Sequence, residues 1–232
     1  MTDGTCYLCG ESYTGRGMTR HLRSCKDDHA AAADGRTVHL KVSGAHRPEY
    51  WLHLGVDAGA TLADVDDVLR AVWLECCGHL SAFEIDGVRY EKPLPDDGPA
   101  YYERRGMDVA VGEVLAADQE VTYEYDFGTT SALSVQVVDA GPYDTGPRPP
   151  GVESIGAYAR NDPPEIPCDG CDAPAAEVCT HHRQYPDEDA WFCADCVADH
   201  GCEDYAYLPV VNSPRTGLCG FTGARLTDWT PA

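Results

Sequence analysis

Cysteines and histidines at metal-ligand spacings are the feature that most restricts how this chain can fold. The chain has 12 cysteines, and ten of them lie near its two ends, often in pairs two residues apart. Thiolate and imidazole are the ligands that Zn²⁺ prefers, in closed tetrahedral sites where the metal is structural. The polar N-terminus shows no secretion signal, so reduced thiols holding metal are expected rather than disulfides. Metal ions should therefore organise both ends.

The N-terminal segment has the spacing of a zinc finger, Cys6-x2-Cys9-x11-His21-x3-Cys25. The first two cysteines would lie on a turn that the following glycine allows. A helix would then present His21 and Cys25 one turn apart. This is the ββα plan of a finger, with cysteine as the fourth ligand.

Three arginines make the predicted finger helix locally positive: Arg16, Arg20 and Arg23. One interpretation is that they contact DNA or RNA. The alternative is a small folded unit that docks on protein or covers the N-terminus. Because a single finger reads only about 3 base pairs, we favour the alternative.

The C-terminal segment has enough ligands for two zinc ions in a cross-braced arrangement, in which alternate ligand pairs share an ion. The first site would use Cys168, Cys171, Cys193 and Cys196, and the second Cys179, His182, His200 and Cys202. His181 is an alternative to His182, which we prefer because it makes a Cys-x2-His pair with Cys179. A single zinc ribbon at the first site is the simpler alternative. With the finger, we expect about three Zn²⁺ ions, all structural.

Outside these sites, Cys76, Cys77 and His79 lie together at the end of a predicted helix. A nucleophilic cysteine–histidine pair there would lack a third, orienting group. Cys76 continues the apolar side of the helix and is interpreted as a core residue, and Cys219 as a buried thiol rather than a spare ligand. Phosphate-binding glycine loops and hydrolase signatures are absent from the sequence. No catalytic residue is assigned, and we do not expect an enzyme.

The chain carries a net charge of −22. We interpret this as a salt-adapted surface, as in a haloarchaeon, because like charges keep a protein soluble where screening is strong. An acidic protein from a mesophile is the alternative. Nucleic-acid affinity comes largely from lysine and arginine neutralising phosphates. Any nucleic-acid contact of so acidic a chain must therefore be confined to a local basic patch.

The composition along the chain divides it into five segments. We expect a zinc finger at 1–28, a short linker at 29–36, an α+β core at 37–140, a Pro/Gly-rich connector at 141–165 and a zinc-binding module at 166–232. Chelation should unfold both ends and spare the core, because metal binding and folding are coupled in small modules. No apolar run approaches the roughly 18 residues that span a bilayer, so a cytoplasmic protein without membrane association is expected.

Within the core, alternating apolar residues predict strands at 38–42, 50–56, 121–127 and 133–138. Strands on one side of a single long helix make a mixed layer of the α+β class, and not a doubly wound sheet.

Two local signals add to this pattern. Thr61 and Asp64 form a variant capping box, and apolar spacing after it predicts one long helix that reaches Cys76. The pair Asp86-Gly87 between apolar residues predicts a hairpin with a type I′ turn.

Four elements of the core stand together in an order that resembles a known family: Tyr50-Trp51-Leu52-His53-Leu54, Thr61-Leu62-Ala63-Asp64-Val65, His79-Leu80-Ser81-Ala82-Phe83-Glu84-Ile85 and Tyr123-Glu124-Tyr125-Asp126-Phe127-Gly128. This is the plasmid pRi ORF-three-like family, also labelled insertion-sequence passenger proteins of the TnpR type. The resemblance covers about 37–140 and implies an α+β domain of unknown biochemical role. The transposon label implies mobility of the gene and no recombination chemistry.

The sequence therefore favours a zinc-stabilised cytoplasmic binding or scaffold protein with a protein partner. The alternative is a nucleic-acid-associated regulator that contacts DNA or RNA through the finger arginines.

Overall fold

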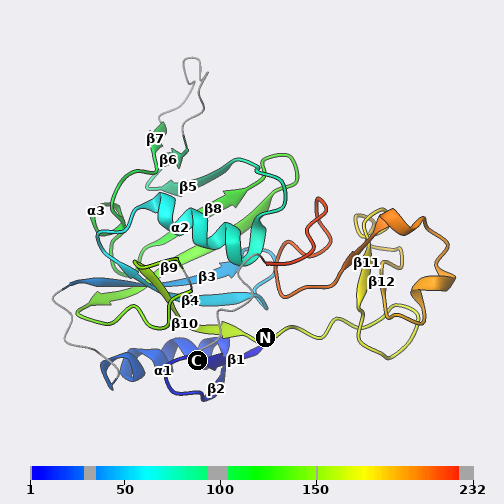
Figure 1. The fold of residues 1–232 in the computed structure, drawn as a ribbon, viewed down its shortest axis with the longest axis horizontal. Helices are drawn as coiled ribbons and strands as arrows, with labels where there is room; N and C mark the ends of the chain where they lie inside the picture. The colour runs from blue at the N-terminus through cyan, green and yellow to red at the C-terminus, as the bar shows by residue number, and fades with distance from the viewer. Residues whose placement is uncertain (1, 29–34, 93–103, 150, 225–232) are drawn as a thin grey trace.

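The computed structural model describes residues 2–28, 35–92, 104–149 and 151–224 (Figure 1). Most of the predicted linker and the last residues of the predicted C-terminal module lie outside these ranges. A large sheet carries a helix on each face, and a smaller sheet lies to one side of it in Figure 1.

The large sheet is 10-stranded, with the order β2-β1-β10-β4-β3-β9-β8-β5-β6-β7. Its strands are β1 (Asp3–Cys6), β2 (Ser12–Thr14), β3 (Thr37–Gly44), β4 (Trp51–Asp57), β5 (Ser81–Ile85), β6 (Val88–Glu91), β7 (Arg104–Gly106), β8 (Glu120–Tyr125), β9 (Ser131–Gly141) and β10 (Ile155–Asn161). Strands β6 and β7 are parallel, whereas the other neighbours are antiparallel. The prediction of an α+β fold with a central mixed sheet is confirmed.

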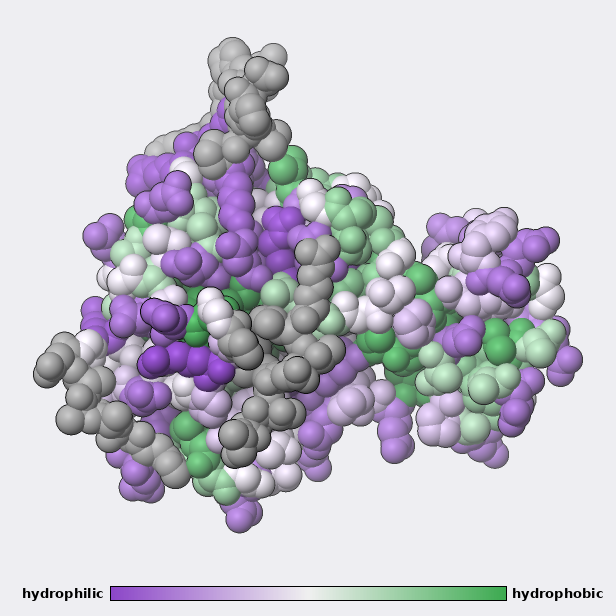
Figure 2. All heavy atoms as spheres, viewed as in Figure 1, coloured by the Kyte–Doolittle hydropathy of each residue, from purple (hydrophilic) through white to green (hydrophobic). Residues whose placement is uncertain are grey.

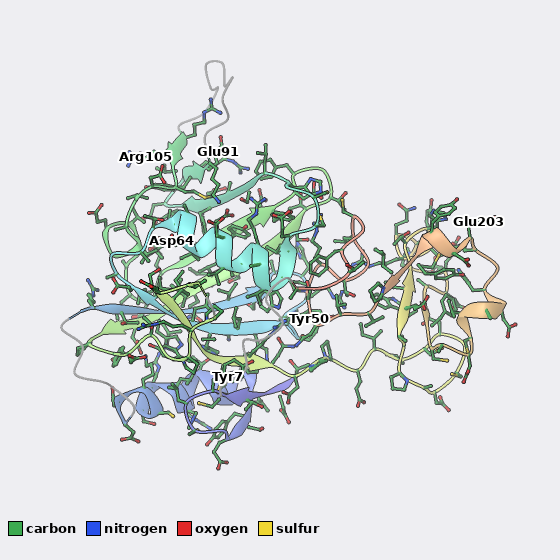
Figure 3. The ribbon with its side chains drawn as sticks, viewed as in Figure 1. Tyr7, Tyr50, Asp64, Glu91, Arg105 and Glu203 are labelled. Atoms are coloured by element: carbon green, nitrogen blue, oxygen red, sulfur yellow. The ribbon has the colours of Figure 1, made fainter. Side chains whose placement is uncertain are left out.

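Helix α2 (Leu62–Leu69) covers one face of this sheet. The predicted capping box is present: the Thr61 hydroxyl accepts from the Asp64 backbone N–H, and the Asp64 carboxylate accepts from the Thr61 backbone N–H. Figure 3 labels Asp64 on this helix. The helix continues as a π-helix, η1 (Arg70–Leu74). The predicted long helix is thus α-helical only in its first part and ends before Cys76.

Strands β3 and β4 are buried on both faces, although their alternation predicted half-buried strands. Leu52 and Leu54 pack in the core with α2. Trp51 belongs to a second apolar cluster, which helix α1 (Gly15–Asp28) supplies with Met18 and Leu22. Helix α1 therefore covers the face of the sheet opposite to α2.

The predicted finger is part of the sheet, because β1 pairs with β10 and β10 pairs with β4. Strand β10 lies inside the stretch 141–165 that was predicted as an extended connector. Glycine allows this segment to pack as a strand. A Cβ at Gly156 would lie 2.4 Å from the Thr145 carbonyl oxygen, so only glycine lets the backbones at these two positions lie so close together. The hairpin prediction is confirmed, since Asp86 (φ 51°) and Gly87 (φ 79°) both have the positive φ of a type I′ turn.

The C-terminal module is built on a 3-stranded sheet of order β12-β11-β13. Its strands are β11 (Glu177–Cys179), β12 (Trp191–Phe192) and β13 (Tyr207–Pro209), and the 3-10 helices η2 (Val197–Asp199) and η3 (Asp204–Ala206) lie between β12 and β13. A short helix, α3 (Val111–Val114), packs on the other side of the molecule near β4. After β13 the chain returns to the larger unit, where the Ser213 hydroxyl donates to the Trp73 carbonyl of η1 at 2.6 Å. Figure 2 shows apolar side chains gathered where the module meets the larger unit.

Candidate metal centres and a basic groove

The four predicted ligands of the finger come together at one point. Cys6 ends β1, Cys9 follows on a turn, and α1 carries His21 and Cys25; their ligand atoms lie within 4.8 Å of one another. Gly10 (φ 80°) closes the turn and donates its N–H to the Cys6 carbonyl at 2.8 Å. The ββα order of the finger is as predicted from the sequence.

The electrostatics of this cluster favour a cation. The sulfur atoms of Cys6 and Cys25 are 3.9 Å apart, and Cys9 sulfur is 3.3 Å from His21 Nε2. Burial, and then the nearby Cys6, raise the pKa of Cys25 to about 12. Without a metal the Cys25 thiol would therefore stay protonated. A bound cation removes the cost of three close thiolates, so the donor set fits Zn²⁺.

The first predicted C-terminal site is also assembled. Cys168, Cys171, Cys193 and Cys196 have their sulfur atoms within 4.8 Å of one another. The Cys193 N–H donates to Cys168 sulfur at 3.2 Å and lowers the pKa of Cys168 to about 6. Such a backbone N–H favours the thiolate that a metal requires.

The second C-terminal site brings together Cys179, His182, His200 and Cys202. Cys179 sulfur is 3.2 Å from His182 Nδ1, and the cluster raises the pKa of His182, mainly through Cys179. The alternative ligand His181 is outside the cluster and packs edge-on against Tyr205 at 5.9 Å. The two C-terminal sites alternate along the chain in the predicted cross-braced order.

The sulfur–sulfur distances in these sites agree with zinc geometry. A tetrahedral ion with Zn–S bonds of about 2.3 Å has ligand edges of about 3.8 Å. The distance is 3.9 Å between Cys6 and Cys25 and 3.6 Å between Cys171 and Cys193. Each cluster offers four protein donors.

The structure also brings together four residues that were not predicted as ligands: Cys76, Cys77, His79 and Cys219. The interpretation of Cys219 as a buried thiol is wrong, because its side chain is exposed. Cys76 is half-buried against the core, as its place on the helix suggested. The sequence signal for this cluster was the pair Cys76-Cys77, followed closely by His79. The fourth residue, Cys219, lies 142 residues after Cys77, so spacing along the chain could not connect it with the other three.

A groove of about 660 Å³ lies between α1 and strands β3 and β4. Arg16, Arg20 and Arg23 follow each other at i, i+4 and i+7, so they share one side of α1. Lys41 of β3 adds a fourth cation, and burial together with the Arg16 charge lowers the pKa of Lys41.

In the part of the chain that the structure describes, these four cations have no acidic partners. Within the residues that the structure describes, none of them pairs with a carboxylate, although the chain has 39 acidic residues. Glu49 at the rim of the groove pairs with Arg47 instead, at 3.1 Å. The groove is thus a local basic patch on an acidic protein.

Beneath the groove, buried polar side chains connect α1 to the sheet. Lys26 Nζ lies 3.0 Å from His39 Nδ1, and His39 Nε2 lies 2.9 Å from His53 Nδ1. His53 Nε2 lies 3.4 Å from the Thr19 hydroxyl at the groove wall. Burial, more than the neighbouring charges, lowers the pKa of His39 and brings that of His53 to about 3. Both rings are therefore neutral at physiological pH.

Comparison with known proteins places the core in a family. The model of the plasmid pRiA4b ORF-3-like protein family matches residues 36–173, more than half of the chain. The match includes Cys168 and Cys171 and begins after the finger. A crystal structure of a protein of unknown function from Methanosarcina mazei Go1 is similar, with 21% identity over 54% of this chain and 69% of that chain, and a TM-score of 0.42. No curated protein matches the chain.

Proposed function

The chain belongs to the plasmid pRiA4b ORF-3-like family, and from that premise we propose that it is a zinc-stabilised binding protein whose basic groove binds the phosphates of DNA or RNA. The supporting observation is the set of four cations in the groove that have no carboxylate partner among the described residues. Nucleic-acid affinity comes largely from such side chains neutralising phosphates. The acidic remainder of the surface would repel the same ligand, so binding would be confined to this groove.

The finger metal has a positional role in this proposal. His21 and Cys25 lie on the same helix as Arg16, Arg20 and Arg23, and α1 packs on Trp51 at the groove floor. A zinc ion bound there would hold the arginines at a constant distance from Lys41. Preorganised cations lose less conformational entropy when a ligand binds.

We propose no catalytic activity. Each cluster supplies four protein donors, which is the composition of a closed structural site and leaves no position for a reactive water. Cysteines gathered with histidines in four-donor clusters support reduced thiols that hold metal and a reducing compartment, which we take to be the cytoplasm. No helix in the described ranges is long and apolar enough to cross a membrane. The net charge of −22 supports a salt-adapted host, such as a haloarchaeon.

The test is fluorescence anisotropy with short labelled DNA and RNA over a series of salt concentrations. We expect the double variant Arg20→Ala/Arg23→Ala to bind at least about tenfold more weakly, and the slope of log Kd against log salt to fall by about two, one unit for each lost phosphate contact. The control is Arg36→Ala, an exposed arginine outside the groove. Wild-type protein that binds neither nucleic acid at any salt, or equal binding by the double variant, would reject the proposal.

One observation supports binding of a protein partner as a second candidate function. Tyr185 and Tyr205 of the C-terminal module are 52% and 78% exposed, and exposed aromatic residues are enriched where proteins bind each other. A photo-crosslinking residue at position 205 should then give one discrete protein adduct in cells, and the same residue at exposed Thr222 should not. Equal labelling from both positions would count against this second candidate.

A further inference from the structure

We propose that Cys76, Cys77, His79 and Cys219 form a fourth zinc site, which fastens the segment after β13 to the core at the end of η1. Three ligands come from the turn after η1, and the fourth comes from the far end of the chain. The proposed ligand is a single Zn²⁺ ion held by three thiolates and one imidazole. The site is independent of the basic groove and of what the groove binds.

The four donor atoms all lie within 4.8 Å of one another, close enough to share one ion. Cys77 sulfur is 3.7 Å from Cys76 sulfur and 3.8 Å from Cys219 sulfur, against the edge of about 3.8 Å expected around zinc. His79 Nε2 lies 3.0 Å from Cys77 sulfur and 3.1 Å from Cys219 sulfur. The finger cluster shows the same pattern, with 3.9 Å between two sulfurs and 3.3 Å from sulfur to nitrogen.

The backbone is shaped to direct these donors inward. Gly78 has φ 82°, which reverses the chain so that His79 faces the two cysteines before it. Cys219 itself has φ 46°, a conformation that residues other than glycine rarely adopt and that is concentrated at functional sites. Gly220 follows with φ 67°, as Gly10 follows Cys9 in the finger.

The segment that carries Cys219 is held against the core by contacts of its own. Arg215 is completely buried, and its guanidinium donates to Asp126 at 2.7 Å and to the Ser131 hydroxyl at 3.0 Å. The Ser213 contact to Trp73 holds the same segment at η1. Cys219 is therefore positioned before any metal binds, which lowers the entropic cost of closing the site.

A second layer of side chains surrounds the donors. Asp126 Oδ1 lies 3.4 Å from His79 Nδ1 and so leaves Nε2 free to face the sulfurs. Arg215 links this carboxylate to the cluster, since it also donates to Cys76 sulfur at 3.4 Å. Carboxylate–histidine pairs of this kind orient imidazole ligands and fix their tautomer in zinc sites.

A disulfide, a set of free thiols and a site for a hard cation each fit this cluster less well than zinc does. A disulfide needs a sulfur–sulfur distance of about 2.05 Å, whereas these sulfurs are spaced as ligands. Cys77 and Cys219 are exposed, and exposed free thiols next to a histidine are prone to oxidation. A hard cation would prefer oxygen donors, and the soft set of three sulfurs and one nitrogen selects zinc among the common divalent ions.

The test is the zinc content of full-length protein, reconstituted with excess zinc and desalted, by mass spectrometry. We expect about four zinc ions per chain, and about three in either Cys77→Ser or Cys219→Ser. Both residues are exposed, so the variants should fold. The control variant Thr222→Ser, at an exposed neighbour of Cys219, should keep about four zinc ions. Cys202→Ser should lose the ion of a different site, so the double variant Cys202→Ser/Cys219→Ser should hold about two.

Alkylation of the native protein gives a second readout that does not depend on counting ions. Cys77 and Cys219 should be protected from a thiol reagent in zinc-loaded protein and labelled after chelation. A wild-type content of about three that Cys219→Ser leaves unchanged, or immediate labelling of Cys77 and Cys219 in the zinc-loaded protein, would overturn the fourth site.

Discussion

His39 and His53 are neutral because they are buried between α1 and the sheet. Each ring is fully buried and has a neighbouring polar atom at hydrogen-bond distance, so the neutral forms are well accommodated. Lys26, also buried, lies at the end of the chain of contacts and pairs with Asp139. A positive charge on His53 would lie near the charges of Lys41 and Lys26. Burial is the main cause of the lowered pKa of His53, and these two lysines lower it further.

This arrangement predicts a dependence of stability on pH. Below about pH 6.5 the unfolded chain binds a proton at His53, whereas the folded protein does not until about pH 3. The free energy of unfolding should therefore fall as pH drops through this window. Between pH 6.5 and 5.5, one such histidine should lower the free energy of unfolding by about 1 kcal/mol.

Denaturant unfolding in saturating zinc would measure this loss. We expect His53→Gln to lose less stability than wild type over that pH step, by up to about 1 kcal/mol. His46→Gln, at an exposed histidine, should keep the full wild-type loss. An unchanged pH dependence in His53→Gln would show that His53 does not titrate as inferred.

Strand β1 connects the finger to the rest of the fold. It pairs with β10 from Gly4–Asn161 to Cys6–Ala159, and the Tyr7 N–H donates to the Tyr158 carbonyl at 2.7 Å. Figure 3 labels Tyr7 on this side of the sheet. From the sequence, we expected that chelation would spare the core, because the finger was taken to be a separate unit. These backbone hydrogen bonds instead make the finger continuous with the large sheet.

We therefore predict that loss of the finger metal loosens part of the central sheet. Cys9→Ser is the suitable variant, because Cys9 is exposed and its replacement removes a ligand without opening a cavity. Amide hydrogen exchange in β10 should accelerate at least about tenfold, since local opening would become about 1.4 kcal/mol easier. The matched change Cys202→Ser, in the C-terminal module, should leave β10 at the wild-type rate. If β10 stays equally protected in Cys9→Ser, the finger is energetically independent.

At the scale of the whole molecule, the dominant property is a net charge of −22. Self-repulsion between carboxylates opposes the compact state, and salt weakens it because the screening length shrinks from about 10 Å at 0.1 M to about 3 Å at 1 M. The melting temperature should therefore rise as NaCl increases over this range.

Differential scanning fluorimetry would check this, with sucrose as the control for a general effect of excluded solutes. A variant with several exposed aspartates changed to asparagine, chosen away from the metal ligands, should melt higher at low salt and gain less from NaCl. A melting temperature independent of salt would contradict the salt-adapted interpretation.

Much of the fold was predictable where contacts lie within a few residues of each other. The capping box at Thr61 and the turn at Asp86-Gly87 use neighbours in the sequence. The alternating strands β3, β4, β8 and β9 were likewise recognised from their own side chains. The same holds for the three predicted metal clusters, whose ligands come in pairs with one to three residues between them.

The sequence by itself therefore determined the α+β class, most elements and three of the four donor clusters. Tertiary structure alone decided which distant segments meet: β10 between β1 and β4, Lys41 opposite the arginines of α1, and Cys219 beside Cys77. Local spacing carries no information about such pairs. They form because the apolar faces of α1 and α2 have to be buried against one sheet. Hydrogen bonds of Ser213 and Arg215 hold the segment after β13 at the core, and this brings Cys219 to Cys77.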